Sequence, residues 1–173
     1  QSPHIYRFNE RVKLAGNEVD DQSLIDAFVQ VDQARRACDL SLSFFEATTL
    51  AAFVIFKARD CDVWVLEVGL GGRLDVVNVV NPDVAVITNI GLDHVDWLGD
   101  SIEKIAYEKA GIIRPNIPVI FAGQQDLPQA IQDKATACKA PLLVLNRDYF
   151  YREMQDGESW MFAASGCTLK LPT

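Results

Sequence analysis

The sequence predicts an α/β fold: a doubly wound, mostly parallel sheet with a small antiparallel β extension at its C-terminal end. Two observations support this prediction. Segments that are apolar on both faces, as strands inside a parallel sheet are, alternate along the chain with segments of helical periodicity. After Arg147 this alternation stops, and short polar and apolar stretches follow that are broken by Asp-Gly and Ser-Gly turns.

The first part of the chain predicts a hairpin and two helices. Residues 5–20 alternate loosely around a Gly-Asn turn pair, which fits a hairpin or an extended loop. Apolar residues at helical spacing predict a helix over residues 23–39 and another over residues 43–60. The second helix begins with a possible capping box, in which Ser43 is followed three positions later by Glu46.

The central part predicts the parallel sheet. Buried strands are expected at residues 63–68, 84–90, 118–121 and 142–145. Between the later strands, helices are expected over residues 101–110 and 126–139, and Gly111 is a natural residue to end the first of them. Strands that alternate with helices in this way predict a parallel sheet with crossover helices.

Composition limits the classes of partner. The 173 residues are 49% hydrophobic and 23% charged, which is typical of a globular domain that buries a core. Asp and Glu outnumber Lys and Arg by 24 to 16, giving a net charge of −8. Nucleic acids and anionic membranes are bound by clustered basic side chains, so we expect neither as a partner. The longest apolar run, residues 50–56, is too short to cross a membrane.

The cysteines and the chain start indicate a cytoplasmic protein and further chain upstream. No two of Cys38, Cys61, Cys138 and Cys167 form a C-x-x-C pair, which predicts reduced cytoplasmic thiols and not a zinc site or a disulfide framework. The sequence shows no signal peptide and opens on Gln1 where an initiator Met would stand, so we expect missing residues upstream.

The carboxyl end of the first expected strand is chemically unusual. In an open parallel sheet, ligands bind beyond these strand ends. Here the strand runs into Glu67 and then into a glycine-rich turn, where a ligand can approach the backbone. The turn is not a dinucleotide fingerprint, because Leu74 stands at the third glycine position. Glu67 is either a metal-binding carboxylate or a buried carboxylate held by backbone donors, and spacing alone favours these two readings about equally.

A histidine follows the second expected strand. His94 comes 27 residues after Glu67, so two neighbouring strands would let both side chains reach one point above the sheet. The alternative is a loop histidine hydrogen-bonded to the backbone. The glycine-rich surroundings and the preceding Glu67 favour the joint site.

Two further features have simple structural readings. Lys109 lies in the last turn of an expected helix, where a cation interacts favourably with the helix dipole. Residues 43–46 read as a helix cap with two core aromatics. Adjacent Phe44 and Phe45 cannot both be buried on one helix face, so one of them is a candidate for lining a pocket.

Six short motifs in a fixed order resemble a known family. They lie at residues 2–5 (SPHI), 8–12 (FNERV), 45–46 (FE), 67–75 (EVGLGGRLD), 90–94 (IGLDH) and 108–112 (EKAGI). In this order they resemble the bifunctional dihydrofolate synthase/folylpolyglutamate synthase family of the Mur ligase superfamily. The resemblance covers nearly the whole chain and is strongest up to about Pro118.

The resemblance implies an ATP-dependent ligase of folate biosynthesis and one-carbon metabolism. Such an enzyme activates a carboxylate as an acyl phosphate, which the amine of L-glutamate attacks. The acceptor is dihydropteroate or a reduced folate. The cofactors implied are ATP and Mg²⁺, the partners are these small molecules, and the full-length enzyme is expected to be a cytoplasmic monomer.

The resemblance also assigns site residues. Ser2, Glu67 and His94 match its Mg²⁺ ligands, and Lys109 matches a catalytic lysine that is carbamylated. The stretch that contacts the pterin substrate is matched by Ser43, Phe44, Phe45, Glu46 and Leu74, with Asp75 directly following. From the residues alone we would expect Mn²⁺ or Zn²⁺, because Mg²⁺ normally prefers oxygen ligands over a histidine nitrogen.

One motif of a complete enzyme is absent from the sequence. Residues 1–173 contain no G-x-x-x-x-G-K-[ST] phosphate loop, which in the family lies just upstream of the position matching Gln1. We therefore expect residues 1–173 to be a partial central, ATP-binding domain that lacks both its phosphate loop and the C-terminal glutamate-ligase domain, and that is inactive alone. Two alternatives stay open: another Mur-type amino-acid ligase of cell-wall synthesis, and a non-catalytic α/β binding module.

Overall fold

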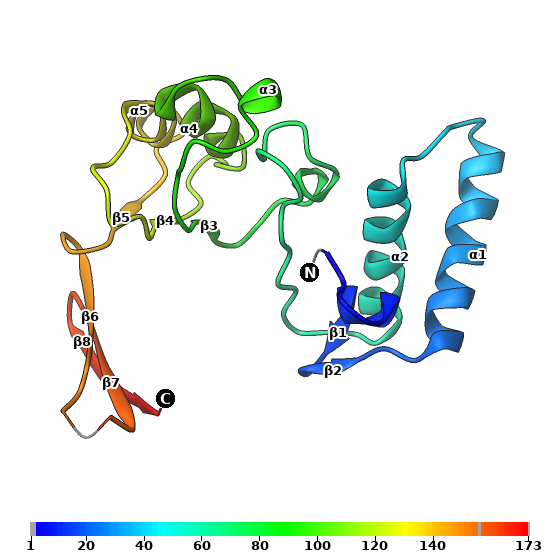
Figure 1. The fold of residues 1–173 in the computed structure, drawn as a ribbon, viewed down its shortest axis with the longest axis horizontal. Coiled ribbons are helices and arrows are strands. Elements are labelled where there is room, and N and C mark those ends of the chain that lie inside the picture. The colour runs from blue at the N-terminus through cyan, green and yellow to red at the C-terminus, as the bar shows by residue number, and fades with distance from the viewer. Residues whose placement is uncertain (1–2, 156, 173) are drawn as a thin grey trace. The chain divides into compact units, whose positions relative to one another are not determined.

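The computed structural model describes residues 3–155 and 157–172, which divide into two compact units (Figure 1). Unit 1 contains the described residues of Gln1–Leu70 and of Asp75–Val79. Unit 2 contains those of Gly71–Leu74 and of Val80–Thr173. The glycine-rich turn that the sequence singles out is therefore shared between the units.

Unit 1 begins with a small hairpin. The 3₁₀ helix η1 (Phe8–Arg11) leads into β1 (Lys13–Leu14), which pairs antiparallel with β2 (Asn17–Glu18). The two turn residues, Ala15 and Gly16, both have positive φ, at 48° and 82°. This conformation suits a two-residue hairpin turn, so the hairpin is confirmed, with its turn one residue earlier than the predicted Gly-Asn pair.

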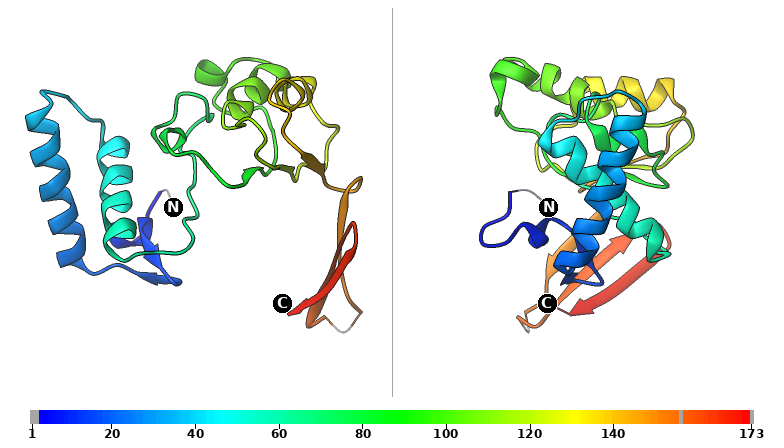
Figure 2. Two further views of the ribbon diagram at one scale, coloured as in Figure 1. Left: turned by 180° about the vertical axis from the view of Figure 1, so that it is seen from behind. Right: turned by 90° about the vertical axis from the view of Figure 1, so that its right-hand side faces the viewer.

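Two helices complete the core of unit 1. Helix α1 (Asp21–Ala37) and helix α2 (Phe44–Ala58) pack against each other as an antiparallel pair, which Figure 2 shows from behind and from the side. Asp20 caps α1 by accepting a hydrogen bond from the backbone of Ser23, so the helix starts slightly before the predicted residue. The buried residues of this core are Val12, Val19, Leu24, Ala27, Val31, Ala51 and Ile55.

The predicted strand at residues 63–68 is wrong: the structure assigns no strand there. Val63 and Val65 are 77% and 89% exposed, whereas Trp64 stacks on Phe53 and Phe56 of α2, with ring centroids 5.9 and 5.6 Å apart. A strand needs a neighbour for its backbone hydrogen bonds. The described strands of unit 1 are only β1 and β2, and they pair with each other. The short 3₁₀ helix η2 (Val76–Val79) ends the unit.

Unit 2 contains the predicted parallel sheet. Its strands are β3 (Ala85–Ile87), β4 (Val119–Phe121) and β5 (Leu142–Val144), and they pair in that order. The crossovers carry α3 (Val95–Leu98), α4 (Ile102–Ala110) and α5 (Gln129–Ala137). Three of the four strands expected from the sequence are thus confirmed, each shorter than expected.

One face of this sheet is the core of unit 2. Helices α4 and α5 cover it, and the largest side chains excluded from solvent there are Ile105, Ile113, Val119, Phe121 and Ile131. Along the strands, Val86 and Leu143 point to the other face and are about half exposed within the unit. The strands were expected to be buried on both faces of the sheet, and within unit 2 only the face covered by α4 and α5 is buried.

A carboxylate links the two helices of this core. Glu103 of α4 accepts hydrogen bonds from the backbone of Gln129 at 3.0 Å and of Ala130 at 2.9 Å. These are the first N–H groups of α5, whose N-cap, Pro128, has no side-chain oxygen. Glu103 thus supplies the cap that the sequence of α5 lacks.

The antiparallel extension is confirmed. Strands β6 (Tyr149–Glu153), β7 (Ser159–Ala164) and β8 (Cys167–Pro172) form a separate sheet. A bridge between Leu145 and Tyr149 joins it to the end of β5, and the hydroxyl of Tyr149 donates to the carbonyl of Phe121 at 3.2 Å. All four cysteines are free, as expected. No helix among the described residues is long and apolar enough to span a membrane.

Candidate functional site

In unit 1, Asp75 organises the glycine-rich turn. Its Oδ2 accepts hydrogen bonds from the backbone of Gly69 at 2.9 Å and of Leu70 at 3.1 Å. Its Oδ1 accepts one from the backbone of Val77 at 2.9 Å, at the start of η2. The carboxylate that the resemblance places next to the substrate therefore already has a structural task, because it closes the turn that follows Glu67.

The two adjacent phenylalanines separate as the sequence requires. A Cβ added to Gly69 would lie 2.6 Å from the Phe45 ring, so only glycine lets this ring lie against the turn. Phe44 stays largely exposed, and the guanidinium of Arg11 lies 5.3 Å from the centroid of its ring. One ring packs on the glycine turn and the other remains available on the surface.

Ser43 and Glu46 form the predicted capping box of α2. The backbone N–H of Ser43 donates to Oε2 of Glu46 at 2.7 Å, and the backbone N–H of Glu46 donates to Oγ of Ser43 at 3.2 Å. The Ser43 N–H group lowers the pKa of the Glu46 carboxyl below its ordinary value, because it stabilises the charged form. Both residues thus cap the helix, and their substrate contacts stay a prediction.

A small cavity of about 70 Å³ lies beside these residues in unit 1. It is lined by Arg11, Val12, Phe45, Thr48, Thr49, Ala52, Phe53, Phe56, Val65, Leu66, Glu67 and Val77. Pockets that enclose a whole organic ligand measure about 300–1,000 Å³, so this cavity can take only part of one.

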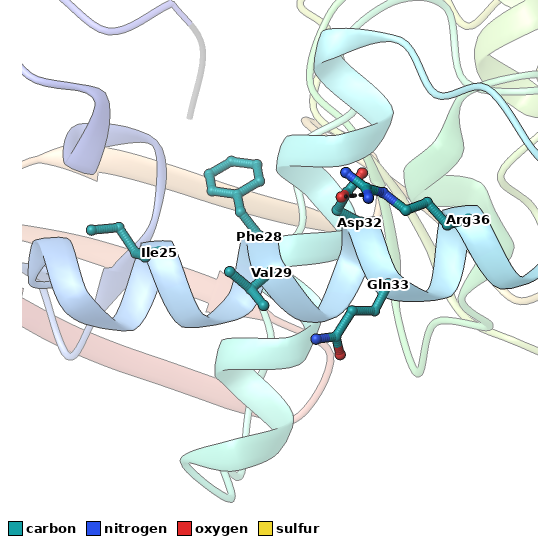
Figure 3. Close-up of a pocket in the computed structure, with 6 residues that line it drawn as sticks. All are labelled: Ile25, Phe28, Val29, Asp32, Gln33 and Arg36. Atoms are coloured by element: carbon teal, nitrogen blue, oxygen red, sulfur yellow. Dashed lines mark ion pairs between the residues drawn. The ribbon is translucent and has the colours of Figure 1, made fainter.

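A larger hollow of about 500 Å³ lies elsewhere in unit 1, along the surface of α1 (Figure 3). Its lining residues all belong to this helix: Ile25, Phe28, Val29, Asp32, Gln33 and Arg36. Asp32 and Arg36 form an ion pair of 2.8 Å in it, drawn as a dashed line. It includes none of the predicted site residues.

In unit 2, the rest of the glycine-rich turn lies against the end of α4. A Cβ on Gly71 would lie 2.9 Å from Leu98 of α3, and one on Gly72 would lie 3.1 Å from the carbonyl oxygen of Glu108. Both glycines have positive φ, at 67° and 152°. Leu74, at the end of this stretch, is exposed. Glycine is therefore needed here both for its conformation and for its lack of a side chain.

Lys109 lies where the sequence placed it, in the last turn of α4, and is partly buried. Its carbonyl accepts the backbone N–H of Ile112 at 3.3 Å. The position suits a cation at a helix C-terminus. It also brings Lys109 beside the turn, since a Cβ on Gly72 would lie 3.3 Å from the Lys109 carbonyl oxygen.

His94 begins α3. Its carbonyl accepts hydrogen bonds from the backbones of Trp97 and Leu98, both at 2.9 Å. Its φ of 52° lies in the left-handed region, which is uncommon for a residue other than glycine. Asp93 accepts the backbone N–H of His94 at 2.7 Å, and its other oxygen lies 3.7 Å from His94 Nε2. The imidazole is exposed.

The predicted metal ligands are not brought together by either unit. Ser2 lies outside the described residues, Glu67 belongs to unit 1 and His94 to unit 2. Within residues 3–155 and 157–172, no cluster of three or more His, Cys, Asp and Glu side chains is suited to hold a metal. Glu67 and His94 are each exposed in their own unit and offer an oxygen and a nitrogen donor, which fits a divalent cation.

Sequence reasoning missed one contact at this site. Arg73 and Glu108 form a salt bridge of 3.0 Å between the glycine-rich turn and α4. Each lies inside a motif, Arg73 next to Leu74 and Glu108 next to Lys109, and their opposite charges were the available signal.

Comparison with known proteins agrees with this fold. A model of the Mur ligase middle domain matches residues 16–143. The chain is 43% identical over 161 residues to the dihydrofolate synthase/folylpolyglutamate synthase of Haemophilus influenzae, an alignment that covers 93% of this chain and 36% of that protein. The chain thus spans well under half the length of this relative.

Solved structures match over the whole chain. E. coli FolC in complex with DHPP and ADP matches with a TM-score of 0.92 and 41% identity, over 100% of this chain and 41% of that one. The bifunctional folylpolyglutamate synthase/dihydrofolate synthase of Yersinia pestis, complexed with AMPPNP and Mn ion, matches with a TM-score of 0.88 and 41% identity, over 98% and 40% of the two chains. Because the family model spans most of the sequence and the fold agrees, this chain belongs to the Mur ligase middle-domain family.

Proposed function

We propose that the chain is the central, ATP-binding part of a dihydrofolate synthase/folylpolyglutamate synthase. The whole enzyme would join L-glutamate to dihydropteroate, forming dihydrofolate, and to reduced folates. The observation that carries the proposal is the match along the entire chain to a FolC structure that holds both DHPP and ADP. The order of the six motifs supports the same assignment.

The chain would supply only part of the ATP site. Residues 1–173 contain no phosphate-loop motif, so we assign that loop, and the C-terminal glutamate-ligase domain, to other parts of the whole protein. The free cysteines support the proposed cytoplasmic location. We further propose that the whole enzyme is a monomer.

Ser2, Glu67 and His94 would hold the divalent cation. A bound cation would offset the negative charge that develops on the transferring phosphoryl group. Mg²⁺ is the proposed ion, and the Mn ion of the Yersinia pestis relative is consistent with a ligand set that includes a histidine nitrogen.

The substrate would be held by apolar and backbone groups. Phe44 and Leu74 are both exposed in their units and offer flat or aliphatic surface to a pterin ring. The Phe45 ring packs on Gly69 of the glycine turn, and Asp75 closes that turn through three N–H groups. With Ser43 and Glu46 fixing the start of α2, the residues around the substrate would be held in place before it binds.

The test is an ATP- and L-glutamate-dependent ligase assay of the whole protein with dihydropteroate. We expect turnover on the order of 1 per second or faster, and none with a UDP-muramyl peptide. The 173-residue chain alone is the control, expected to be inactive. Turnover with the muramyl peptide would instead indicate a cell-wall ligase, and dihydropteroate binding without turnover would indicate a binding module.

Lys109 provides a second test, since its two readings give opposite results. A cation that only complements the helix dipole contributes about 0.3–1 kcal/mol, and Lys109→Arg would then be nearly neutral. A lysine that must be carbamylated cannot be replaced by Arg, whose guanidinium stays protonated. We expect the Arg variant to be inactive, and acetate to restore part of the activity of Lys109→Ala. A fully active Arg variant would refute the carbamate.

A further inference from the structure

We propose that Arg73 and Glu108 form a clamp that holds the glycine-rich turn on the last turn of α4 and thereby positions Lys109. The proposal rests on the function proposed above, because it assigns Lys109 a place in that reaction. Arg73 and Glu108 are positioning residues in this account: they act on Lys109 through the backbone and contact no substrate.

The side chains of the clamp meet in a two-pronged contact. Nε of Arg73 donates to Oε1 and Oε2 of Glu108 at 3.1 and 3.2 Å, and Nη2 donates to Oε1 at 3.0 Å. Two guanidinium nitrogens on one carboxylate fix the orientation of both groups, which a single hydrogen bond does not. The carboxylate of Glu108 raises the pKa of Arg73 above its ordinary value, so the guanidinium stays charged.

The same two residues are also joined through their backbones. The N–H of Arg73 donates to the carbonyl oxygen of Glu108 at 2.9 Å, at the end of α4 where carbonyl groups lack helical partners. The guanidinium further lies 5.7 Å from the ring centroid of Tyr107. Arg73 is thus bound to Glu108 by both its backbone and its side chain. The glycine-rich turn cannot rotate or slide along α4 without breaking both contacts.

Glycines on both sides let the segments approach this closely. A Cβ on Gly111 would lie 2.3 Å from Cβ and 2.5 Å from Cα of Arg73. The φ of Gly111 is −60°, which any residue can adopt, so the backbone conformation does not require glycine there. Glycine is required at residue 111 because Arg73 approaches it so closely. In the other segment, Gly72 likewise leaves room for the carbonyl oxygen of Glu108.

The clamp acts on Lys109 because Glu108 and Lys109 are neighbours in the last turn of α4. The last turn of a helix frays readily unless its carbonyls are held. Lys109 directly follows Glu108 in that turn, and its own carbonyl lies against Gly72. Gly71 lies close to Leu98 of α3, the helix that directly follows His94. One turn of chain thus joins the segments that carry His94 and Lys109.

Stability alone does not account for the pair. The side chain of Arg73 is 42% exposed and that of Glu108 is 20% exposed, so water screens the pair in part and limits its contribution to folding, even though the contact is two-pronged. Their defining property is geometry, so the expected effect of breaking them is a loss of catalytic alignment with the fold retained.

The experiment compares Arg73→Met, Glu108→Gln and the double variant in the whole enzyme. We expect each single variant to lower kcat about 10- to 100-fold, the cost of misplacing a catalytic group by about an ångström. KM for ATP and dihydropteroate should change by less than about 3-fold. The double variant should be no worse than the more severe single variant, because both remove one interaction.

A second readout follows the lysine itself. With ¹³C-labelled bicarbonate, the carbamate carbon of Lys109 gives an NMR signal, and the bicarbonate concentration needed for its half-maximal intensity should rise in both single variants. Arg73→Lys keeps the charge without the two-pronged contact and should fall between wild type and Arg73→Met. Arg114→Met is the matched control, because Arg114 is another arginine at the same helix end, where it donates to the Gly111 carbonyl at 3.0 Å and to Oδ1 of Asn81 at 3.1 Å.

The outcomes separate the clamp from the function on which it rests. An active wild type whose Arg73→Met variant keeps its kcat and carbamate signal overturns the clamp alone. An equal loss in Arg114→Met overturns it as well, because the effect would then belong to the helix end in general. A wild type with neither ligase activity nor a carbamate signal overturns the proposed function and the clamp with it.

Discussion

Residues 63–68 and residues 84–90 have the same apolar character, yet only the second segment forms a strand. Ile87 of β3 is buried against α4 and α5, and its backbone pairs with β4. Val65 in the first segment faces solvent, and the neighbouring Trp64 packs on α2. An apolar run thus becomes a strand only where a neighbouring strand accepts its hydrogen bonds.

The two units also satisfy their backbone groups differently. Unit 2 does so mainly through the ladder of β3, β4 and β5. Unit 1 does so mainly within helices α1 and α2, and at two loops through side-chain carboxylates: Glu10 accepts three backbone N–H groups and Asp75 another three.

Of the two apolar residues compared above, Ile87 and Val65, the largest effect is expected from truncating the buried Ile87. Ile87→Ala should lower the free energy of unfolding of unit 2 by about 2–5 kcal/mol, because it leaves a cavity under the sheet. Val65→Ala, at a side chain 89% exposed, should cost less than about 0.5 kcal/mol. Urea denaturation followed by circular dichroism measures both. Equal losses would mean that residues 63–68 are buried in solution.

The ends of the two segments carry the predicted metal ligands. Glu67→Gln in the whole enzyme should lower kcat/KM about 100-fold or more, because it removes a negative charge from the cation site. The fold should be retained, because Gln keeps the size of the side chain and Glu67 is exposed. Glu18→Gln, in β2 of the same unit, is the control with the same chemical change. Near-normal rates of Glu67→Gln at saturating Mg²⁺ would make Glu67 a structural residue.

Trp64 tests whether residues 63–68 are anchored to α2 through their packed side. Trp64→Ala removes two aromatic contacts, to Phe53 and Phe56, and should cost unit 1 about 1–3 kcal/mol at roughly 0.5–1.5 kcal/mol per pair. Trp97→Ala in α3 is the matched control, because Trp97 is exposed. A loss in the control as large as in Trp64→Ala would show that burial does not distinguish these two residues.

The smallest effect concerns the carboxylates of unit 1. Backbone N–H groups of Ile5, Arg7 and Tyr6 lower the pKa of Glu10 to about 2. Since the folded pKa is depressed, the stabilisation is complete above the ordinary glutamate pKa and is lost as the pH falls from there through about 2. Glu10→Gln should therefore accelerate amide exchange at residues 5–7 near neutral pH, and the difference from wild type should shrink below about pH 4.3. A difference that does not vary with pH would refute this role of the charge.

The sequence by itself determined most of the local structure. Helical periodicity and the capping box located α1 and α2, and turn pairs located the hairpin and the antiparallel extension. These signals are local, because caps and turns depend on residues within a few positions of one another. The six motifs located the family for a similar reason: they record chemistry in short runs of residues.

Only the tertiary structure decided which apolar run pairs and which residues of the motifs meet. Nothing within residues 63–68 shows whether a partner strand lies beside them, because strand pairing joins residues distant in sequence. The contact between Arg73 and Glu108 spans 35 residues and depends on Gly72 and Gly111 leaving room for two backbones to approach. The sequence showed that these residues were present, and the fold decided that they touch.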